Sequence, residues 1–133
     1  EAVSYPAYAD LTEVNDAVNA LPYKADPADF DDWSPISPAG GDCDSYAVGK
    51  LHRLLGLDWP IERLRLACCY VETGEYHAVL VVDTPDHGQV VLDNRQQLPQ
   101  TLTNLHALGY IPDRIQQTGG SRTWVSWDWV SLQ

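Results

Sequence analysis

The sequence predicts an α+β domain in which N-terminal helices pack against an antiparallel β-sheet. Apolar residues recur at helical spacing in two segments that end before residue 60. After residue 65 they instead form short β-prone runs separated by Gly, Pro and Asp. The chain has 133 residues, 44% of them hydrophobic, which suits a single domain (1–133) with one core.

The first helix is predicted to begin after Asp10, a candidate N-cap with Glu13 three residues later, and to end at Pro22. Its apolar positions are Leu11, Val14, Val18 and Leu21. Residues 23–41 are rich in Asp, Pro, Ala and Gly, and they predict a long loop that Trp33 pins to the core.

A second helix is predicted to run from Asp42 to about Leu57. The positions at helical spacing that should form its buried stripe are Ala47, Val48, Leu51, Leu54 and Leu55. Lys50 and Arg53 are predicted to face water, because charged side chains are rarely buried.

The rest of the chain predicts the strands of the sheet. The run 76–82 is continuously apolar, which is typical of a central strand buried on both faces. Residues 98–109 favour a short helix or a loop. The other strands are predicted at 66–72 and 90–93, and in a closing hairpin made of 110–117 and 122–129.

The charge and the cysteine count exclude several function classes. A net charge of −11 argues against a nucleic-acid partner and against an anionic membrane surface, since both are bound through Lys and Arg. No apolar run approaches the roughly 18–20 residues of a membrane span, so membrane insertion is not expected. Three cysteines, two of them adjacent, make neither a disulfide framework nor a structural zinc site.

Cys43 is the candidate nucleophile. It follows Gly40 and Gly41 and lies in the first turn of the second predicted helix. The free N–H groups and the dipole of a helix N-terminus favour an anion, which lowers a thiol pKa and generates the reactive thiolate. A small buried core residue is the alternative interpretation of a free cysteine, and it stays open on this evidence.

His77 and Asp93 are the candidate base and its orienting acid. His77 begins one predicted strand and Asp93 ends the next. If the connecting turn is centred on Pro85, residues whose numbers sum to 170 face each other, so His77 pairs directly with Asp93. Such a carboxylate fixes the imidazole tautomer while the other ring nitrogen meets the thiol. The remaining histidines (His52, His87 and His106) are predicted to be solvated, and Cys68 and Cys69 to be core residues.

Asp42 and Asp44 flank the candidate nucleophile, and adjacent carboxylates oppose the formation of a thiolate. They therefore need another role. Capping the helix and binding a cation are the two roles that carboxylates at this position can fill.

An ordered set of segments between about residues 10 and 115 resembles the bacterial transglutaminase-like cysteine peptidases, a family that includes the LapG-type periplasmic proteases that release biofilm adhesins. The segments are Val14-Asn15, Asn19, Asp32-Trp33, Gly41-Asp42-Cys43-Asp44-Ser45-Tyr46-Ala47, Leu64-Arg65-Leu66, His77-Ala78-Val79-Leu80, Leu92-Asp93-Asn94 and Tyr110-Ile111-Pro112. The family usually has a further acid where this chain has Ser45, and the segment after Trp33 is shorter here than in typical members.

This resemblance implies a papain/transglutaminase-like fold and a Cys-His-Asp triad of Cys43, His77 and Asp93. The expected function is a cysteine hydrolase that cleaves a peptide or amide bond in a protein or peptide substrate through a thioester. It needs no cofactor for the chemistry, but the resemblance implies a calcium site at Asp42 and Asp44. It also implies a periplasmic or otherwise exported location, with a cytoplasmic one left open.

For the oxyanion, we expect the backbone N–H of Cys43 and one side chain from the upstream region, with Asn15, Asn19 and Trp33 as the candidates. Three alternatives to hydrolysis remain. The same triad can transfer an acyl group to an amine, as transglutaminases and amidases do. The fold can also serve as a non-catalytic binding or virion module, or as a plain structural domain. The sequence does not predict the oligomeric state.

Overall fold

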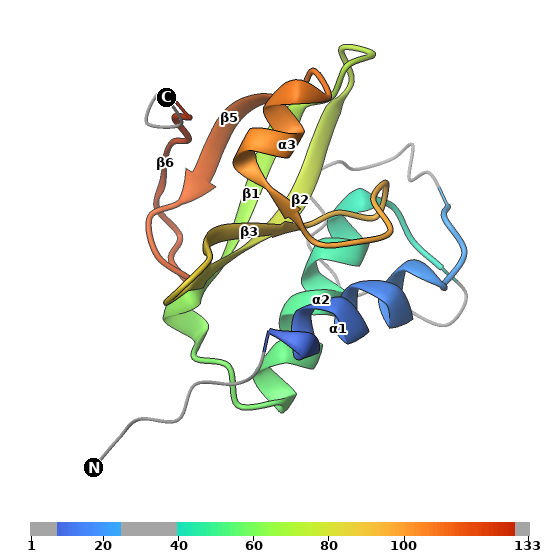
Figure 1. The fold of residues 1–133 in the computed structure, drawn as a ribbon, viewed down its shortest axis with the longest axis vertical. Helices are drawn as coiled ribbons and strands as arrows, with labels where there is room; N and C mark the ends of the chain where they lie inside the picture. The colour runs from blue at the N-terminus through green and yellow to red at the C-terminus, as the bar shows by residue number, and fades with distance from the viewer. Residues whose placement is uncertain (1–7, 25–39, 130–133) are drawn as a thin grey trace.

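The computed structural model describes residues 8–24 and 40–129. They form the α+β architecture predicted from the sequence (Figure 1). Its elements in chain order are α1 (Ala9–Asn19), α2 (Cys43–Gly56), η1 (Ile61–Arg63), β1 (Leu64–Tyr70), β2 (Tyr76–Thr84), β3 (Gly88–Leu92), β4 (Gln100–Thr101), α3 (Leu102–Ala107), β5 (Ile111–Gln116) and β6 (Trp124–Ser126). In this part of the chain, no helix combines the length and apolar character needed to cross a membrane.

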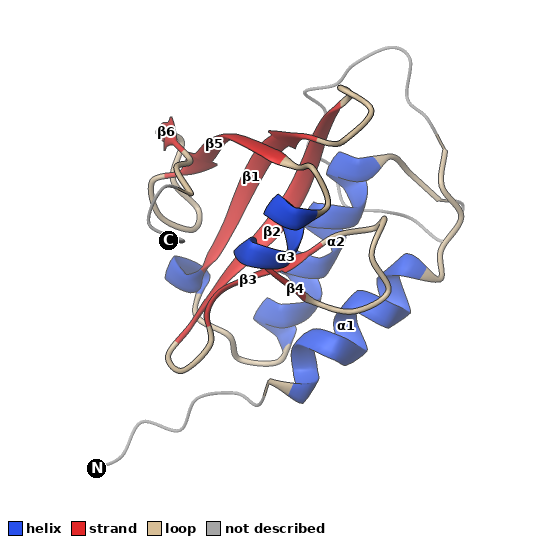
Figure 2. Ribbon diagram, turned by 45° about the horizontal axis from the view of Figure 1, so that its top comes forward, coloured by secondary structure: helices blue, strands red, loops and turns tan. Residues whose placement is uncertain are grey.

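The strands form one open antiparallel sheet in the order β4-β3-β2-β1-β5-β6. Helices α1 and α2 lie together on one side of the sheet, and α3 lies on the other side (Figures 1 and 2). The predicted closing hairpin is confirmed, because β5 pairs with β6. The segment 98–109 contains the short helix α3, capped by the Thr101 side chain.

Strand β2 lies at the centre of the sheet and is buried on both faces. Leu80 and Val82 pack in a core cluster with α1 and α2, whereas Val79 and Val81 pack with Leu105 of α3 and residues near the C-terminus. This two-sided burial accounts for the continuous apolar run in the sequence, since neither face of the strand meets water.

Helix α1 begins two residues earlier than predicted. Its N-cap is Tyr8, which makes no capping hydrogen bond through its side chain, so the assignment of Asp10 as N-cap is wrong. Asp10 lies in the first turn instead, and its carboxylate accepts a hydrogen bond from Trp59 Nε1 at 3.2 Å. The local pattern predicted that the Asp10 carboxylate caps the helix, but it binds the distant Trp59 side chain instead.

Helix α2 begins as predicted. Asp42 is its N-cap, and its Oδ1 accepts hydrogen bonds from the backbone N–H of Ser45 (3.2 Å) and from the Ser45 hydroxyl (3.1 Å). Gly40 lies two residues before the N-cap and has a φ of +106°. A Cβ at this position would lie 2.2 Å from the carbonyl oxygen of Pro22. No side chain fits at this position.

The predicted solvent face of α2 is wrong at one residue. Lys50 is fully buried, while Leu55, assigned to the buried stripe, is 36% exposed. Position 50 lies seven residues after Cys43 and four before Leu54, and both of these are buried. The burial is tolerated because Asn15 of α1 accepts a hydrogen bond from Lys50 Nζ at 2.8 Å.

The predicted register of the β2–β3 hairpin is wrong by two residues. Leu80 pairs with Leu92 and Thr84 with Gly88, so paired numbers sum to 172 and the turn is centred on Asp86 instead of Pro85. A shift of two keeps every side chain on its predicted face, because the side-chain period of a strand is two. His77 and Asp93 are therefore diagonal neighbours on one face instead of direct partners.

Candidate active site

Cys43 and His77 line one pocket of about 320 Å³ at the N-terminus of α2. Tyr23, Tyr76 and Arg95 are among the other lining residues. Tyr23 forms a parallel β-bridge with Gly41, the residue that precedes the N-cap of α2. This bridge connects the segment that carries Tyr23 to the segment that leads to Cys43. The sequence reasoning missed Tyr23, because nothing in the pattern distinguished it from other loop aromatics.

The Cys43 thiol is largely protected from solvent, with an exposed fraction of 8%. Its Sγ lies 3.5 Å from Asp44 Oδ1, to which it donates a hydrogen bond, and it packs with Cys68 and Ala78. Burial, reinforced by Asp44 and Asp42, raises the pKa of the thiol to about 12. The thiol is thus protonated at neutral pH in this structure: its pKa is raised, whereas its position at a helix N-terminus had led us to expect a lowered one.

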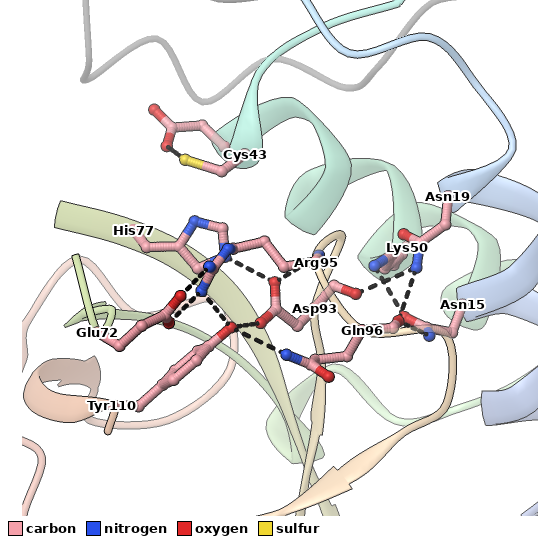
Figure 3. Close-up of polar contacts among 11 residues, drawn as sticks. Asn15, Asn19, Cys43, Lys50, Glu72, His77, Asp93, Arg95, Gln96 and Tyr110 are labelled. Carbon is pink, nitrogen blue, oxygen red and sulfur yellow. Dashed lines mark hydrogen bonds and ion pairs between the residues drawn. The ribbon is translucent and has the colours of Figure 1, made fainter. Parts of the chain in front are cut away.

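The imidazole of His77 lies between the thiol and the carboxylate of Asp93 (Figure 3). Its Nε2 donates a hydrogen bond to Asp93 Oδ1 at 2.6 Å, and both side chains are buried. This bond assigns the proton of the neutral imidazole to Nε2 and leaves Nδ1 as the acceptor. The contact between His77 and Asp93 that the sequence predicted is present, despite the shift in register.

Asp93 follows directly after β3 and accepts three hydrogen bonds. Besides His77, its partners are the backbone N–H of Arg95 (3.0 Å, Oδ1) and the hydroxyl of Tyr110 (2.6 Å, Oδ2). Burial raises the pKa of the Asp93 carboxyl, but His77 and the two other donors lower it by more, so the pKa lies below its usual value. The carboxylate is therefore ionised at neutral pH although it is fully buried.

Tyr110 connects this carboxylate to an ion pair at the edge of the site. Arg95 Nη1 donates hydrogen bonds to the Tyr110 hydroxyl and to Glu72 Oε1, each at 2.9 Å. Figure 3 shows this chain of contacts from Glu72 through Arg95 and Tyr110 to Asp93. Sequence reasoning assigned none of the three to the site, although Tyr110 belongs to one of the segments that carry the family resemblance.

Replacing Tyr110 with phenylalanine removes one of the donors to Asp93 while keeping the buried ring. We expect the free energy of unfolding to fall by about 1–3 kcal/mol, because a buried carboxylate oxygen loses its partner. The rate at which iodoacetamide alkylates Cys43 should fall about tenfold, since His77 is then less firmly oriented. Urea unfolding and peptide mass spectrometry measure the two effects.

The matched control is Tyr70→Phe, which removes the hydroxyl of an exposed tyrosine at the end of β1. It should change neither quantity. A Tyr110→Phe variant with wild-type stability and alkylation rate would contradict a role for this hydroxyl in holding Asp93.

Asn15 and Asn19 lie on α1 and are not among the residues that line the Cys43 pocket. Asn15 Nδ2 donates to the carbonyl oxygens of Gln96 (3.0 Å) and Gln97 (3.1 Å). Asn19 Nδ2 donates to those of Asp93 (3.1 Å) and Gln96 (3.0 Å). The structure thus brings both amides to the loop that carries Asp93 and not to Cys43.

The remaining predicted site residues are Trp33, a candidate oxyanion donor, and Asp42 and Asp44, the candidate metal ligands. Trp33 lies outside the described residues. Among the residues that are described, no group of three or more His, Cys, Asp or Glu side chains is arranged to hold a metal ion. Asp42 and Asp44 offer two carboxylates of the oxygen type that Ca²⁺ prefers, but Ca²⁺ takes six to eight oxygen ligands. Among the described residues, no third His, Cys, Asp or Glu side chain joins these two carboxylates.

The histidines predicted to be solvated are exposed, and Cys68 and Cys69 are fully buried, as predicted. Burial raises the pKa of both thiols. All three cysteines are free, so they provide an internal comparison: one thiol borders a pocket and two lie in the core.

Comparison with known proteins places this chain in a family. The chain matches the family model of the bacterial transglutaminase-like cysteine proteinases (BTLCP) over residues 2–130. No curated protein sequence matches it. Among solved structures it is similar to calcium-bound LapG of Legionella pneumophila (24% identity, TM-score 0.71, 93% of this chain and 77% of that one). LapG from the same organism also matches in an EGTA-treated form (23% identity, TM-score 0.68, 93% and 73%) and in a third structure (24% identity, TM-score 0.68, 84% and 66%). The fold is thus that of the LapG structures, and the chain belongs to the bacterial transglutaminase-like cysteine proteinase family.

Proposed function

We propose that this protein is a cysteine peptidase in which Cys43 is the nucleophile, His77 the general base and Asp93 the residue that orients His77. The observation that supports this most strongly is the buried hydrogen bond from His77 Nε2 to Asp93 Oδ1, in a pocket that His77 shares with Cys43. A base held by a third group beside a nucleophile is the arrangement that nucleophilic catalysis requires.

The raised thiol pKa determines how the first step proceeds. Because the pKa of Cys43 is about 12, little thiolate exists at neutral pH before the substrate binds. We propose that His77 Nδ1 takes the thiol proton as Sγ attacks the scissile carbonyl carbon. The developing oxyanion is stabilised by the backbone N–H of Cys43, one of the N–H groups that a helix N-terminus leaves without an intrahelical partner.

The intermediate then collapses to a thioester. The C–N bond breaks, and the leaving amine takes the proton held by His77. A water molecule attacks the thioester carbonyl and gives a proton to His77. The C–S bond then breaks, His77 returns the proton to Sγ, and the acid product leaves. An amine in place of water would give acyl transfer on the same residues. Mass analysis of the products distinguishes the two, since hydrolysis adds water and transfer adds the amine.

The function is tested by alkylating the thiols with iodoacetamide and following each cysteine-containing peptide by mass spectrometry. We expect Cys43 to react faster than Cys68 and Cys69, and His77→Ala to slow Cys43 at least tenfold or so. Equal, slow reaction of the three thiols, unaffected by His77→Ala, would favour a binding or structural domain. Digestion of a peptide library should in parallel yield hydrolysed fragments from the wild-type protein.

Calcium is a separate proposal. The LapG structures are calcium-bound in one case and EGTA-treated in another. We propose that this chain binds Ca²⁺ beside Cys43 with Asp42 and Asp44 among the ligands, where the cation would neutralise carboxylates next to the thiol. Calorimetric titration of the chain with CaCl₂ should detect binding that D42N/D44N abolishes. Asn caps helices as well as Asp, so the variant keeps the start of α2; unchanged binding in it would exclude these ligands.

A further inference from the structure

Lys50 is a fully buried charged side chain that the proposed mechanism does not use. It lies on α2, two helical turns after Cys43, and its Nζ donates a hydrogen bond to Asn15 Oδ1 at 2.8 Å. A lysine is rarely buried without a specific partner, because desolvating the ammonium is costly. Burial lowers its pKa to about 7, and the nearby Asp93 carboxylate opposes that shift. Because burying Lys50 costs free energy of folding, the residue is expected to have a function.

The partner of Lys50 leads directly to the loop that carries Asp93. While its Oδ1 accepts from Lys50, Asn15 uses Nδ2 to bind the carbonyl oxygens of Gln96 and Gln97. Asn19, one turn further along α1, binds the carbonyl oxygens of Asp93 and Gln96. Figure 3 shows the three side chains gathered on the opposite side of Asp93 from His77.

These bonds form a clamp, which we define as Lys50, Asn15 and Asn19. The clamp fixes the backbone of residues 93–97, while His77 and Tyr110 hold the Asp93 side chain. The Asn15 amide satisfies its partners in one orientation only: its Nδ2 faces the two carbonyl oxygens, and its Oδ1 faces Lys50 Nζ, which donates to it. With the amide reversed, its oxygen would face two carbonyl oxygens.

We propose that Lys50 is a positioning residue: by orienting Asn15, it holds the 93–97 loop so that Asp93 meets His77. This inference rests on the proposed catalytic roles of Cys43, His77 and Asp93. It extends the site to two residues on α1 and one on α2 that do not line the Cys43 pocket. A small misplacement of Asp93 is enough to reduce the rate, because catalysis depends on alignment to within about 1 Å.

The test uses Lys50→Met in the full chain, with Lys24→Met, the other lysine and an exposed one, as the control. Methionine keeps the length of the side chain and removes both the charge and the donor. Three quantities are measured: the iodoacetamide alkylation rate of Cys43, the downfield proton resonance of His77 Nε2–H in the NMR spectrum, and the thermal unfolding midpoint.

We expect Lys50→Met to slow alkylation of Cys43 about tenfold or more and to shift or broaden the His77 resonance. The unfolding midpoint should change little, because the gain from no longer burying the amine offsets the cost of leaving the buried Asn15 Oδ1 without a donor. Lys24→Met should match the wild type in all three measurements. If Lys50→Met does not fold, Asn19→Ala decides the question, since it removes the clamp bond to the Asp93 carbonyl at a half-buried position.

Two results would overturn the inference, and they differ. If His77→Ala slows alkylation while Lys50→Met and Asn19→Ala leave the rate and the His77 resonance unchanged, the clamp is structural only and the proposed peptidase function stands. If His77→Ala itself leaves the rate unchanged, the proposed function fails and the positioning role fails with it.

Discussion

Replacing Cys43 with alanine is expected to lower peptide hydrolysis by at least about 10⁴-fold, because the two other thiols, Cys68 and Cys69, are fully buried and do not line the pocket. The side chain is small and 8% exposed, so its loss should leave the fold intact. The measurement is the amount of cleaved product from a peptide library, quantified by mass spectrometry. A circular dichroism spectrum and an unfolding curve like those of the wild type would establish that the variant is folded.

Cys68→Ala provides the matched comparison, since it removes a thiol that packs in the same cluster as Cys43. This variant should retain most of the hydrolytic activity. Substantial cleavage by Cys43→Ala would refute the proposed nucleophile, and loss of activity in both variants would point to a packing effect of the cluster instead of a chemical role for Cys43.

The second large effect is expected for Asp93→Asn. The amide has nearly the shape of the carboxylate, but it cannot serve as the charged acceptor that fixes the His77 tautomer with Nδ1 free. We therefore expect hydrolysis to fall by about 10³–10⁴-fold. Stability should fall by about 1–3 kcal/mol, since the buried donors of Tyr110 and Arg95 compete for a single acceptor oxygen.

The pH dependence of the free energy of unfolding tests the ionisation of Asp93 independently. Because the folded-state pKa of Asp93 is lowered, its contribution is present above the pKa of an unfolded aspartate and is lost as the pH falls through the folded-state value. Asp93→Asn should thus be less sensitive to acid than the wild type. Asp83→Asn, which alters a partly exposed ion pair with Arg65, is the control and should leave hydrolysis unchanged. Wild-type activity in Asp93→Asn would eliminate the proposed orienting role.

The fold and the contact between His77 and Asp93 followed from the sequence because both depend on local periodicity. The hairpin register was displaced by two residues, yet the contact survived, since an even shift preserves the face of every side chain. A shift of one residue would have separated the pair. The start of α2 was equally predictable, because the Asp42 carboxylate accepts a hydrogen bond from the backbone N–H of Ser45, only three residues later.

The parts that sequence reasoning missed depend on partners distant in the chain. The charge of Lys50 indicated exposure, whereas its spacing from Cys43 and Leu54 indicated burial, and the partner that decides between them is on another helix. Likewise, nothing near Arg95 in sequence indicates that it bridges Glu72 and Tyr110. The raised pKa of Cys43 reflects three-dimensional burial, which cannot be read from its position at the start of a helix.

The clamp also constrains the order in which the protein can mature. Its bonds join Asn15 to Gln96 and Gln97, residues 81 and 82 positions later in the chain. Contacts between residues so far apart in the sequence form late in folding, because closing the long intervening loop costs conformational entropy. During synthesis, α1 and the thiol emerge long before the carboxylate loop that α1 holds. A nascent chain would therefore carry the proposed nucleophile before the proposed base is aligned, and the proposed site would be assembled only after most of the domain has been synthesised.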